Sequence, residues 1–597
     1  MPVLGRQARA AAKEYHNAVH KQQRLHWDEF PAEDMNIWKA AQYLKPDQGS
    51  EWATILPLRK ADGSRTRSNS GQAEELLVTF FPPLPGTIEE EGDRPQRAAV
   101  AMSKLTEEKI ESYLMRTKPW KAAREDRLPT REWRQVWLAV KAGVRYFFQT
   151  SIDSGILPRQ WKVAKIVLLK KLGKDHYSRA EAWRPISLLS TLGKLLDAVI
   201  AERISFAVET HGLLLTNHFG ARKQRSAQQA LLLLQEQSYT AWRSRKVVSL
   251  VIFDVTGSYH GVCKYRLLQR LAARGVPTKL VNWADAFRSE RTATIVVNGR
   301  ASGASELKQA GLPRGSPLSP IFLFFNTDLV QQRIDQSGGA MAFVDDYTAW
   351  VVGKTTAENR DCLQTIVQQA TAWESRSGAS FEGDKTSFVH FTRNSHQAAD
   401  EPIIVKGQDF RHASKVKILG LAVDSELRYK EHTARATTRG LGAAMALKRL
   451  RALSSSVTRK LFNARVAPVV DYASSVWMHA RGARGERVLN RVQRFGSQAV
   501  IGCFRTVGTA VAEAEAILVT TQERHLRKAL RIRIDLHSVL GTHPLAQLTR
   551  RRAYKRFVFS MQKIAEVAQV SPEEARNEPA LHLSFMGDET RNSRLCR

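Results

Sequence analysis

Residues 342–352 read AFVDDYTAWVV, two aspartates with apolar residues on both sides. This pattern predicts a hairpin of two buried strands, with Asp345 and Asp346 at its turn. A second apolar run, VVSLVIFD at residues 247–254, predicts a buried strand that ends on Asp254. Carboxylates held among apolar strands are costly unless a cation or hydrogen bonds compensate them. The two stretches therefore predict a sheet that delivers three carboxylates to its strand ends.

Three convergent carboxylates suit a pair of Mg²⁺ ions, which are hard cations that take oxygen ligands. Two such ions about 4 Å apart lower the pKa of an attacking hydroxyl and stabilise a leaving pyrophosphate. Because neighbouring strand residues face opposite ways, we expect Asp345 to be the firm ligand and Asp346 the weaker one. An alternative stays open, since aspartate is a favoured turn residue and the pair could be a polar hairpin tip.

A loop rich in glycine, proline and serine, QAGLPRGSPLSPIFLFF at residues 309–325, lies between these acids in the sequence. Gly315 frees the backbone, while Ser316 and Pro317 predict the start of a helix that runs to residue 329. The backbone N–H groups of such a loop can approach the anionic oxygens of a nucleotide. A purely structural turn is the alternative.

The composition indicates folded domains with an anionic partner. The chain has 597 residues, of which 43% are hydrophobic, and a net charge of +33 from 91 basic and 58 acidic residues. This charge predicts nucleic acid as the partner, ahead of an acidic membrane surface. Four cysteines without a Cys-x-x-Cys pair argue against disulfides and cysteine-rich zinc sites. No apolar run approaches the roughly 18 residues that span a bilayer, so we expect no membrane partner.

The pattern of strands and helices is α+β. Residues 162–171 predict a strand, and residues 194–208 and 226–237 predict helices. Residues 80–95, FFPPLPGTIEEEGDRP, are too rich in proline and glycine for regular structure and predict a linker. Beyond about residue 430 the strand signals fade, and residues 431–470 hold eight Lys/Arg against one acid. That region predicts helices with a cationic face.

The order of these motifs resembles that of the reverse transcriptases, and most closely the non-LTR, LINE-type retrotransposon branch, especially the group found in filamentous fungi. The palm motifs of that family are matched by FDVTGSYHGV (253–262), GLPRGSPLSPIFLFFN (311–326), AFVDDY (342–347), FEGDKTSF (381–388) and KILGLAVDSELRY (417–429). Its fingers are matched by WKVAKIVLLKKLGK (161–174), WRPISLLSTLGKLLDAVIAERI (183–204) and NHFGARKQRSAQQAL (217–231). Its thumb is matched by LFNARVAPVVDYASSVW (461–477). Five ordered palm motifs are far more specific than any one of them.

The resemblance implies a right-hand polymerase of the α+β class with an antiparallel palm sheet. Its expected parts are an N-terminal helical and linker segment (1–98), fingers (99–244), palm (245–430), a basic helical thumb (431–540) and a C-terminal tail (541–597). The implied activity is that of an RNA-directed DNA polymerase, a nucleotidyltransferase that uses two Mg²⁺ ions to add dNTPs to a primer 3′-hydroxyl. The implied partners are an RNA template, a DNA primer or target, dNTPs and an endonuclease supplied elsewhere, since the chain resembles a fragment of such an element. Nuclear action is implied, with a mitochondrial destination as the alternative raised by the basic N-terminus.

The resemblance also implies roles for residues at the expected centre. Asp254, Asp345 and Asp346 would hold the two metal ions. Lys385 matches the lysine that protonates the leaving pyrophosphate, and its alternative is a solvated surface charge. Tyr259 matches the aromatic residue that crowds the 2′ side of the incoming sugar and selects deoxynucleotides, and its alternative is a core tyrosine.

Cationic residues complete the set. Lys171 and Arg184 match fingers residues that grip the triphosphate. Arg314, beside Gly315 in the nucleotide-contacting loop, stands where the family commonly carries glutamine. The template–primer backbone would be bound by Arg435, Arg439, Lys448, Arg449 and Arg451.

Departures from the family pattern keep other functions open. Besides Arg314, the stretch AAREDRLP at residues 122–129 has lost the proline and both glycines of the family's turn. A catalytically inactive, nucleic-acid-binding remnant is one alternative. An RNA-templated RNA polymerase is another, against which Tyr259 argues.

Overall fold

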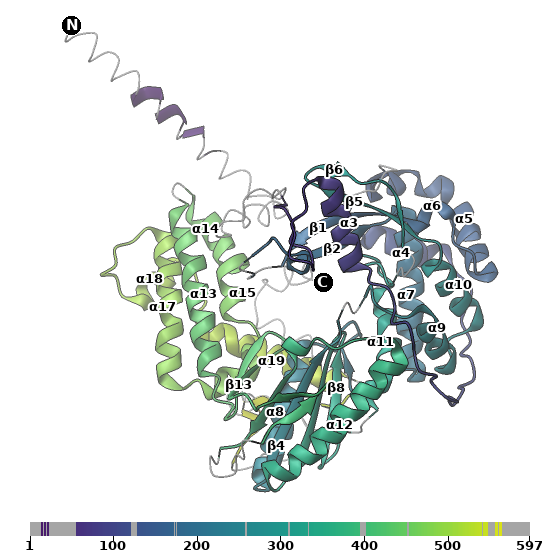
Figure 1. Ribbon diagram of the computed structural model, residues 1–597. Helices are drawn as coiled ribbons and strands as arrows, with labels where there is room; N and C mark the ends of the chain where they lie inside the picture. The colour runs from purple at the N-terminus through teal and green to yellow at the C-terminus, as the bar shows by residue number, and fades with distance from the viewer. Residues whose placement is uncertain are drawn as a thin grey trace.

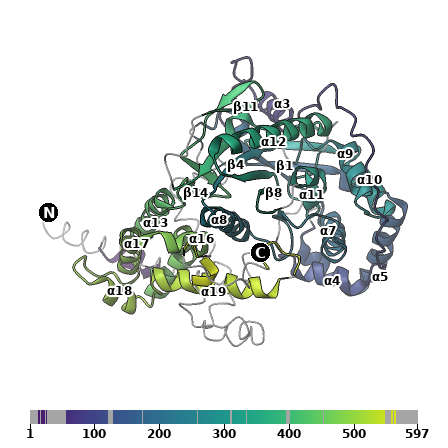
Figure 2. The ribbon, with the colours of Figure 1, turned by 90° about the horizontal axis from the view of Figure 1, so that it is seen from below.

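The computed structural model describes residues 55–563 with gaps, together with a few helical residues between 13 and 25. The gaps are residues 121–127, 172–173, 175, 257–258, 308–310, 332–333, 394–400, 451–452, 540, 547–555 and 559. Two larger sheets, each flanked by helices, are followed by a bundle of C-terminal helices (Figures 1 and 2). The predicted α+β class is confirmed.

The first sheet is built around β1 (Val163–Lys170), which confirms the strand predicted at residues 162–171. It pairs antiparallel with β2 (Trp183–Leu188) and parallel with β5 (Thr292–Val297), and two short strands pair with β5: β6 (Arg300–Ala301) and β7 (Ser305–Glu306). Helix α3 (Asn69–Phe80) shares a buried apolar cluster with this sheet.

The second sheet has the strand order β10-β4-β9-β8-β3. Strand β4 (Val247–Asp254) has the predicted bounds, and β8 (Gly338–Phe343) and β9 (Asp346–Gly353) form the predicted hairpin, although only Asp345 lies in the turn, because Asp346 pairs with Asp254 and Phe343 as the first residue of β9. The pairs made by β4 with β9 and β10 (Ser387–Phe391) are antiparallel. The edge strand β3 (His218–Phe219) is parallel to β8, so the expectation of an antiparallel sheet is wrong at this edge.

Helices cover both faces of the second sheet. Alternate residues of β4 point to opposite sides: Val251 lies in the apolar cluster with helix α12 (Thr356–Ser377), and Leu250 in the cluster with α8 (Ala227–Arg243). Further helices of the first cluster are α4 (Glu107–Arg116), α5 (Thr130–Ser154), α7 (Thr191–His211), α9 (Lys264–Ala273) and α10 (Thr278–Arg288), and α6 (Arg159–Lys162) leads into β1. Helices α7 and α8 confirm the two helices predicted from sequence.

The segment after the glycine-rich loop corrects one prediction. Residues 317–329 do not form a single helix, because Ser319–Ile321 and Thr327–Val330 are 3₁₀ turns on either side of the one-turn helix α11 (Phe322–Phe325). The Ser316 hydroxyl accepts from the Leu318 N–H at 3.0 Å and donates to Asp197 at 2.6 Å, so it does not cap a continuous helix. Pro320 lies inside the first 3₁₀ turn and has no N–H to donate.

From residue 425 onward the described part of the chain is helical, as predicted. Two small hairpins precede this helical region in the chain: β11 (Ile403–Val405) with β12 (Gln408–Phe410), and β13 (Lys415–Ile418) with β14 (Leu421–Asp424). The helices are α13 (Lys430–Arg449), α14 (Ser455–Leu461), α15 (Ala467–Val470), α16 (Ser474–Trp477), α17 (Gly482–Ile501), α18 (Thr509–Glu515) and α19 (Thr521–Ser538). Helices α13 and α17 pack closely, since a Cβ added to Gly440 would lie 2.6 Å from Val470 and 3.1 Å from Val492. None of the described helices combines the length and apolar character needed to cross a bilayer.

Residues 81–106, which contain most of the predicted linker, form neither helix nor strand, as expected. They are nevertheless bonded to the folded part of the chain. The N–H of Arg97 donates to the Ala273 carbonyl at 3.0 Å, and that of Val100 to Gly275 at 2.9 Å. Arg94 forms ion pairs with Glu91 and with Asp328. We call residues 81–106 the strap.

Candidate active site

The carboxylates predicted to act together are brought close by the pairing of β4 with β9. Asp254 ends β4 and lies directly opposite Asp346, the first residue of β9. The next pair inward, Phe253 and Tyr347, stacks its rings with centroids 6.0 Å apart. Asp345 occupies the turn of the hairpin, whose Val344 carbonyl accepts a hydrogen bond from the Asn326 side chain. The sheet register therefore gathers three acids at one strand end.

The protonation of these acids reflects their crowding. Burial raises the pKa of Asp346 to about 7, and the negative charges of Asp345 and Asp254 add to the effect. Burial also raises the pKa of Asp254, and Asp345 and Glu382 contribute in the same direction. Neighbouring carboxylates disfavour each other's ionisation until a cation neutralises their charge. The site is therefore electrostatically prepared for a cation.

Lys385 provides one such cation. It ends a 3₁₀ turn (Gly383–Lys385), and its Nζ lies 2.6 Å from Asp254 Oδ2 and also contacts Glu382. Burial alone would lower the pKa of Lys385, but the hydrogen bonds to these two carboxylates raise it overall. Lys385 is therefore protonated beside the predicted metal ligands. Glu382 was not identified from the sequence, although it lies in the quoted FEGDKTSF motif.

The donor set suits a hard divalent cation, because its acids offer oxygen ligands and because burial, together with their mutual repulsion, raises the pKa of two of them. Within the part of the chain that the structure describes, however, no three His, Cys, Asp or Glu side chains are close enough together to hold a metal ion. Asp254 is paired with Lys385 instead. The residues fit the ion by chemistry, and full coordination would require the carboxylates to converge.

Tyr259 lies close enough to Asp345 to feel its charge. Burial raises the pKa of its hydroxyl, and the charge of Asp345 raises it further. The half-buried ring lies 5.7 Å from Phe322, and the Arg314 guanidinium lies 5.3 Å from the ring centroid. The Tyr259 carbonyl accepts from the Leu312 N–H at 2.5 Å, which joins it to the glycine-rich loop. Tyr259 thus packs against the edge of the apolar core, beside the glycine-rich loop and near Asp345.

The predicted triphosphate-binding cations also lie near one another. Burial lowers the pKa of Lys171, and the positive charges of Lys385, Arg184 and Arg314 lower it further. Lys171 follows β1, and exposed Arg184 lies on the neighbouring β2. The structure therefore brings Lys171 of the first sheet near Lys385 and Glu382, beside the carboxylates of the second, where these cations could bind an anion between them.

Two bonds hold the loop at Gly315 against the first sheet and α7. The Ser187 N–H of β2 donates to the Arg314 carbonyl at 2.8 Å. The Ser316 hydroxyl donates to Asp197 of α7, whose pKa is raised to about 7 by burial. Sequence reasoning missed Asp197, although an acid inside the apolar run KLLDAVIAERI is itself a signal of a buried partner.

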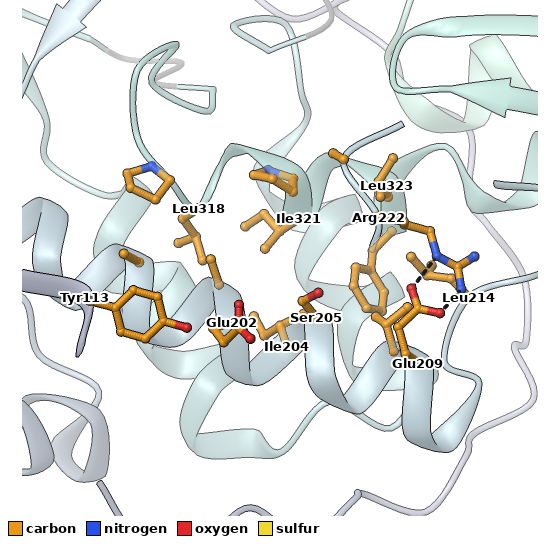
Figure 3. Close-up of a pocket in the computed structure, with 17 residues that line it drawn as sticks. Tyr113, Glu202, Ile204, Ser205, Glu209, Leu214, Arg222, Leu318, Ile321 and Leu323 are labelled. Atoms are coloured by element: carbon orange, nitrogen blue, oxygen red, sulfur yellow. Dashed lines mark hydrogen bonds and ion pairs between the residues drawn. The ribbon is translucent and has the colours of Figure 1, made fainter. Parts of the chain in front are cut away.

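A cavity of about 260 Å³ lies behind this loop, between α7 and residues 317–324 (Figure 3). Its walls are mainly apolar, with Tyr113 and Glu202 toward one end and the Arg222–Glu209 ion pair at the other. The segment that follows Gly315 is therefore not packed solidly against α7.

The predicted nucleic-acid-binding cations lie on α13. Arg439, Lys448 and Arg449 are exposed and Arg435 is half-buried. Arg451 lies outside the described residues, as do residues 122–127 of the altered turn.

Residues 170–423 match the family model described as "Reverse transcriptase (RNA-dependent DNA polymerase)". This segment is a reverse transcriptase domain. It contains Asp254, Asp345, Asp346 and Glu382, and the cations Lys171, Arg184, Arg314 and Lys385. The mixed helix-and-sheet fold of the described residues is the one predicted for a right-hand polymerase.

Curated proteins similar to the chain come from non-LTR retrotransposons. The RNA-directed DNA polymerase from mobile element jockey of Drosophila melanogaster is 24% identical over 351 residues, or 58% of this chain and 38% of that protein. The Pol polyprotein of retrotransposable element R1 of Bradysia coprophila is 23% identical over 501 residues, or 81% of this chain and 48% of that protein. The R2 polyprotein of Popillia japonica is 32% identical over 187 residues, or 30% of this chain and 24% of that protein. The chain thus spans about half or less of these relatives.

Among solved structures, apo telomerase from Candida tropicalis aligns with 75% of this chain and 71% of its own, at 13% identity and a TM-score of 0.35.

Proposed function

We propose that the chain is the RNA-directed DNA polymerase of a non-LTR retrotransposon, which extends a primer 3′-hydroxyl with dNTPs on an RNA template. The observation that carries the proposal is the β4–β9 register, which sets Asp254 opposite Asp346 inside the matched domain. The cations drawn from the first sheet supply the complementary charge for a triphosphate.

In this proposal Asp254, Asp345 and Asp346 hold two Mg²⁺ ions. When bound, the ions activate the primer hydroxyl and neutralise charge that develops on the phosphates. Lys385 holds a proton on Nζ at neutral pH and can donate it to the leaving pyrophosphate. Lys385 occupies only Oδ2 of Asp254, so the other carboxylate oxygen could take a metal ion while Lys385 turns toward the phosphates as substrate binds.

The remaining residues position the substrate. Lys171, Arg184 and Arg314 would bind the triphosphate, and Gly315 would let the loop backbone approach the nucleotide. The Tyr259 ring would exclude a 2′-hydroxyl from the sugar site. Arg435, Arg439, Lys448, Arg449 and Arg451 would contact the template–primer backbone.

The proposed parts of the right hand are fingers at 99–244, palm at 245–430 and thumb at 431–540, between the N-terminal segment and the C-terminal tail. The proposal also includes membership of the group found in filamentous fungi, a DNA target, an endonuclease supplied elsewhere and nuclear action rather than mitochondrial import. Imaging of the tagged chain in a host cell tests the compartment, and a purely mitochondrial signal would refute nuclear action.

A second candidate is an inactive nucleic-acid-binding remnant. It is favoured by the Lys385–Asp254 ion pair, by the lack of a converged acidic triad among the described residues, and by Arg314 in place of glutamine. Both candidates bind nucleic acid, so binding does not distinguish them, whereas metal-dependent incorporation does.

Primer extension on an oligo-primed RNA template, with Mg²⁺ and dNTPs or rNTPs, tests the proposal. We expect dNTP incorporation that is abolished in Asp345→Ala. Asp409→Ala, which removes an exposed carboxylate from β12, is the matched control and should extend normally. Folded wild-type protein that binds the primed template without extending it would establish the remnant. Preference for rNTPs would indicate an RNA polymerase.

A further inference from the structure

Helix α17 carries a row of arginines that none of the roles above uses. Arg484, Arg487, Arg491 and Arg494 recur at three- and four-residue spacing, so they lie on one face of the helix. All four are exposed. At 1.5 Å per residue the row is about 15 Å long. We call these four residues the arginine stripe.

The stripe faces away from α13. The buried residues of α17 include Leu489, Val492, Gly496 and Val500, which repeat at the same spacing on the opposite side. Val492 lies against Gly440 of α13, and Gly496 against Phe462. Figure 1 shows α17 and α18 at the edge of the molecule, with α13 and α15 on the side toward the sheets. The stripe is therefore separate from the α13 cations assigned to the template–primer.

The charge of the stripe is not neutralised by neighbours. Within the described ranges none of its four arginines forms an ion pair with a carboxylate. The nearest acid on the same helix, Glu486, is half-buried and interacts electrostatically with Arg481. An exposed row of four cations without acids is complementary to a polyanion with regularly spaced charges.

An exposed aromatic ring lies just beyond the stripe. Phe504, in the loop between α17 and α18, is 84% exposed. The loop is bonded to the stripe, because Arg494 donates to the carbonyl of Arg505, which is itself exposed. Cations that follow a phosphate backbone, together with an aromatic platform for a base, are the two components of single-strand binding sites.

We propose that the arginine stripe and Phe504 form a second nucleic-acid-binding surface that takes a single-stranded polynucleotide outside the polymerase cleft. The arginines bind successive phosphates, and Phe504 stacks on an unpaired base. A duplex would offer the same phosphates but no free base face, so the aromatic ring favours a single strand. This surface goes beyond the polymerase activity and does not depend on it.

The test measures binding of a fluorescent oligo(U) to the full chain by anisotropy, with a short unlabelled RNA–DNA primer–template kept saturating so that it occupies the cleft. The stripe variant is Arg484→Gln, Arg487→Gln, Arg491→Gln and Arg494→Gln combined. Its control changes four exposed cations that form no ion pair among the described residues: Lys60→Gln, Lys109→Gln, Arg300→Gln and Lys354→Gln. Both variants lose the same net charge, and only one loses the row.

We expect the slope of log affinity against log salt to fall by about 3 in the stripe variant, at roughly 0.7 per phosphate contact on a single strand. The control variant should retain most of the slope. Phe504→Ala should weaken binding roughly 5- to 150-fold while leaving the slope unchanged. Oligo(U) and oligo(dT) distinguish an RNA from a DNA strand, and a blunt duplex should be insensitive to Phe504→Ala.

Equal binding by the stripe and control variants would overturn the proposal. So would a matching loss of extension by the stripe variant on the short primer–template, since that would place the stripe in the cleft. Phe504→Ala serves as an independent test if the quadruple variant is unstable. The binding measurement is also informative if the chain proves unable to extend primers, so failure of the polymerase proposal would be seen separately.

Discussion

Replacing Gly315 with alanine tests the contact between the glycine-rich loop and the first sheet. Gly315 has φ +126°, a conformation that L residues rarely adopt. Forcing another residue into such a region costs about 1–3 kcal/mol. An added Cβ would also lie 2.7 Å from the Ser187 carbonyl oxygen, which is backbone and cannot rotate away.

The loop and β2 must therefore separate by at least about 0.3 Å to reach the 3.0 Å at which real Cβ contacts begin. That movement weakens the 2.8 Å bond from the Ser187 N–H to the Arg314 carbonyl, whose net contribution is about 0.5–1.5 kcal/mol. We expect a total destabilisation of about 2–4 kcal/mol, because the strain and the lost bond act on the same loop.

Gly303→Ala is the matched control, since nothing lies within 4 Å of its added Cβ and its φ is outside the left-handed range. Urea unfolding of both variants and the KM for dTTP on a primed RNA template measure the effect. We expect Gly315→Ala alone to lower the unfolding midpoint and raise KM. Two variants that agree within about 0.5 kcal/mol would refute the reasoning.

Three further predictions concern acids and the sugar site. At limiting Mg²⁺, primer extension should fall as the pH drops below about 7, because Asp346 then takes up a proton. Asp254→Asn removes one repelling charge and should shift the titration of Asp346, followed by ¹³C NMR, to lower pH. An unchanged midpoint would contradict the electrostatic coupling between the two acids. Asp197 has a folded pKa of about 7, above its unfolded value, so its contribution to stability is complete below the unfolded pKa and is lost as the pH rises through 7. Asp197→Asn should therefore flatten the dependence of urea stability on pH between 5 and 8, and a dependence equal to wild type would rule out Asp197 as its source. Tyr259→Ala should raise the ratio of rNTP to dNTP incorporation, whereas Tyr259→Phe, which keeps the ring, should not.

The sequence alone predicts those strands and helices whose buried residues are determined by the local pattern of apolar residues. The bounds of β4 could be predicted because a short apolar run that ends on Asp254 is typical of a buried strand. The β8–β9 hairpin followed from two acids between apolar stretches, and α7 and α8 from their helical spacing.

Features that depend on distant partners could not be predicted this way. Asp254 and Asp346 lie opposite each other only because β4 pairs with β9, and these strands are about ninety residues apart in the sequence. The bond from Ser316 to Asp197 spans 119 residues, and it occupies the hydroxyl that sequence reasoning assigned to a helix cap. The local sequence at Ser316 is typical of a helix cap, but the hydroxyl instead donates to Asp197, which is distant in the sequence.

The strap also bears on how the chain could be shortened by protein engineering. A chain begun at residue 99, the proposed edge of the fingers, would keep Val100 on Gly275 but lose Glu91 and Arg94. Arg270, which is 1% exposed, would then lose its Glu91 partner, and Asp328 its Arg94 partner. Arg270 and Asp328 would keep their 3.4 Å contact with each other, and Asp328 its contact with Arg274, so the truncation would weaken this buried charge network without leaving either charge unpaired. A shortened chain should therefore start before residue 81, so that composition alone is a poor guide to where this chain can be cut.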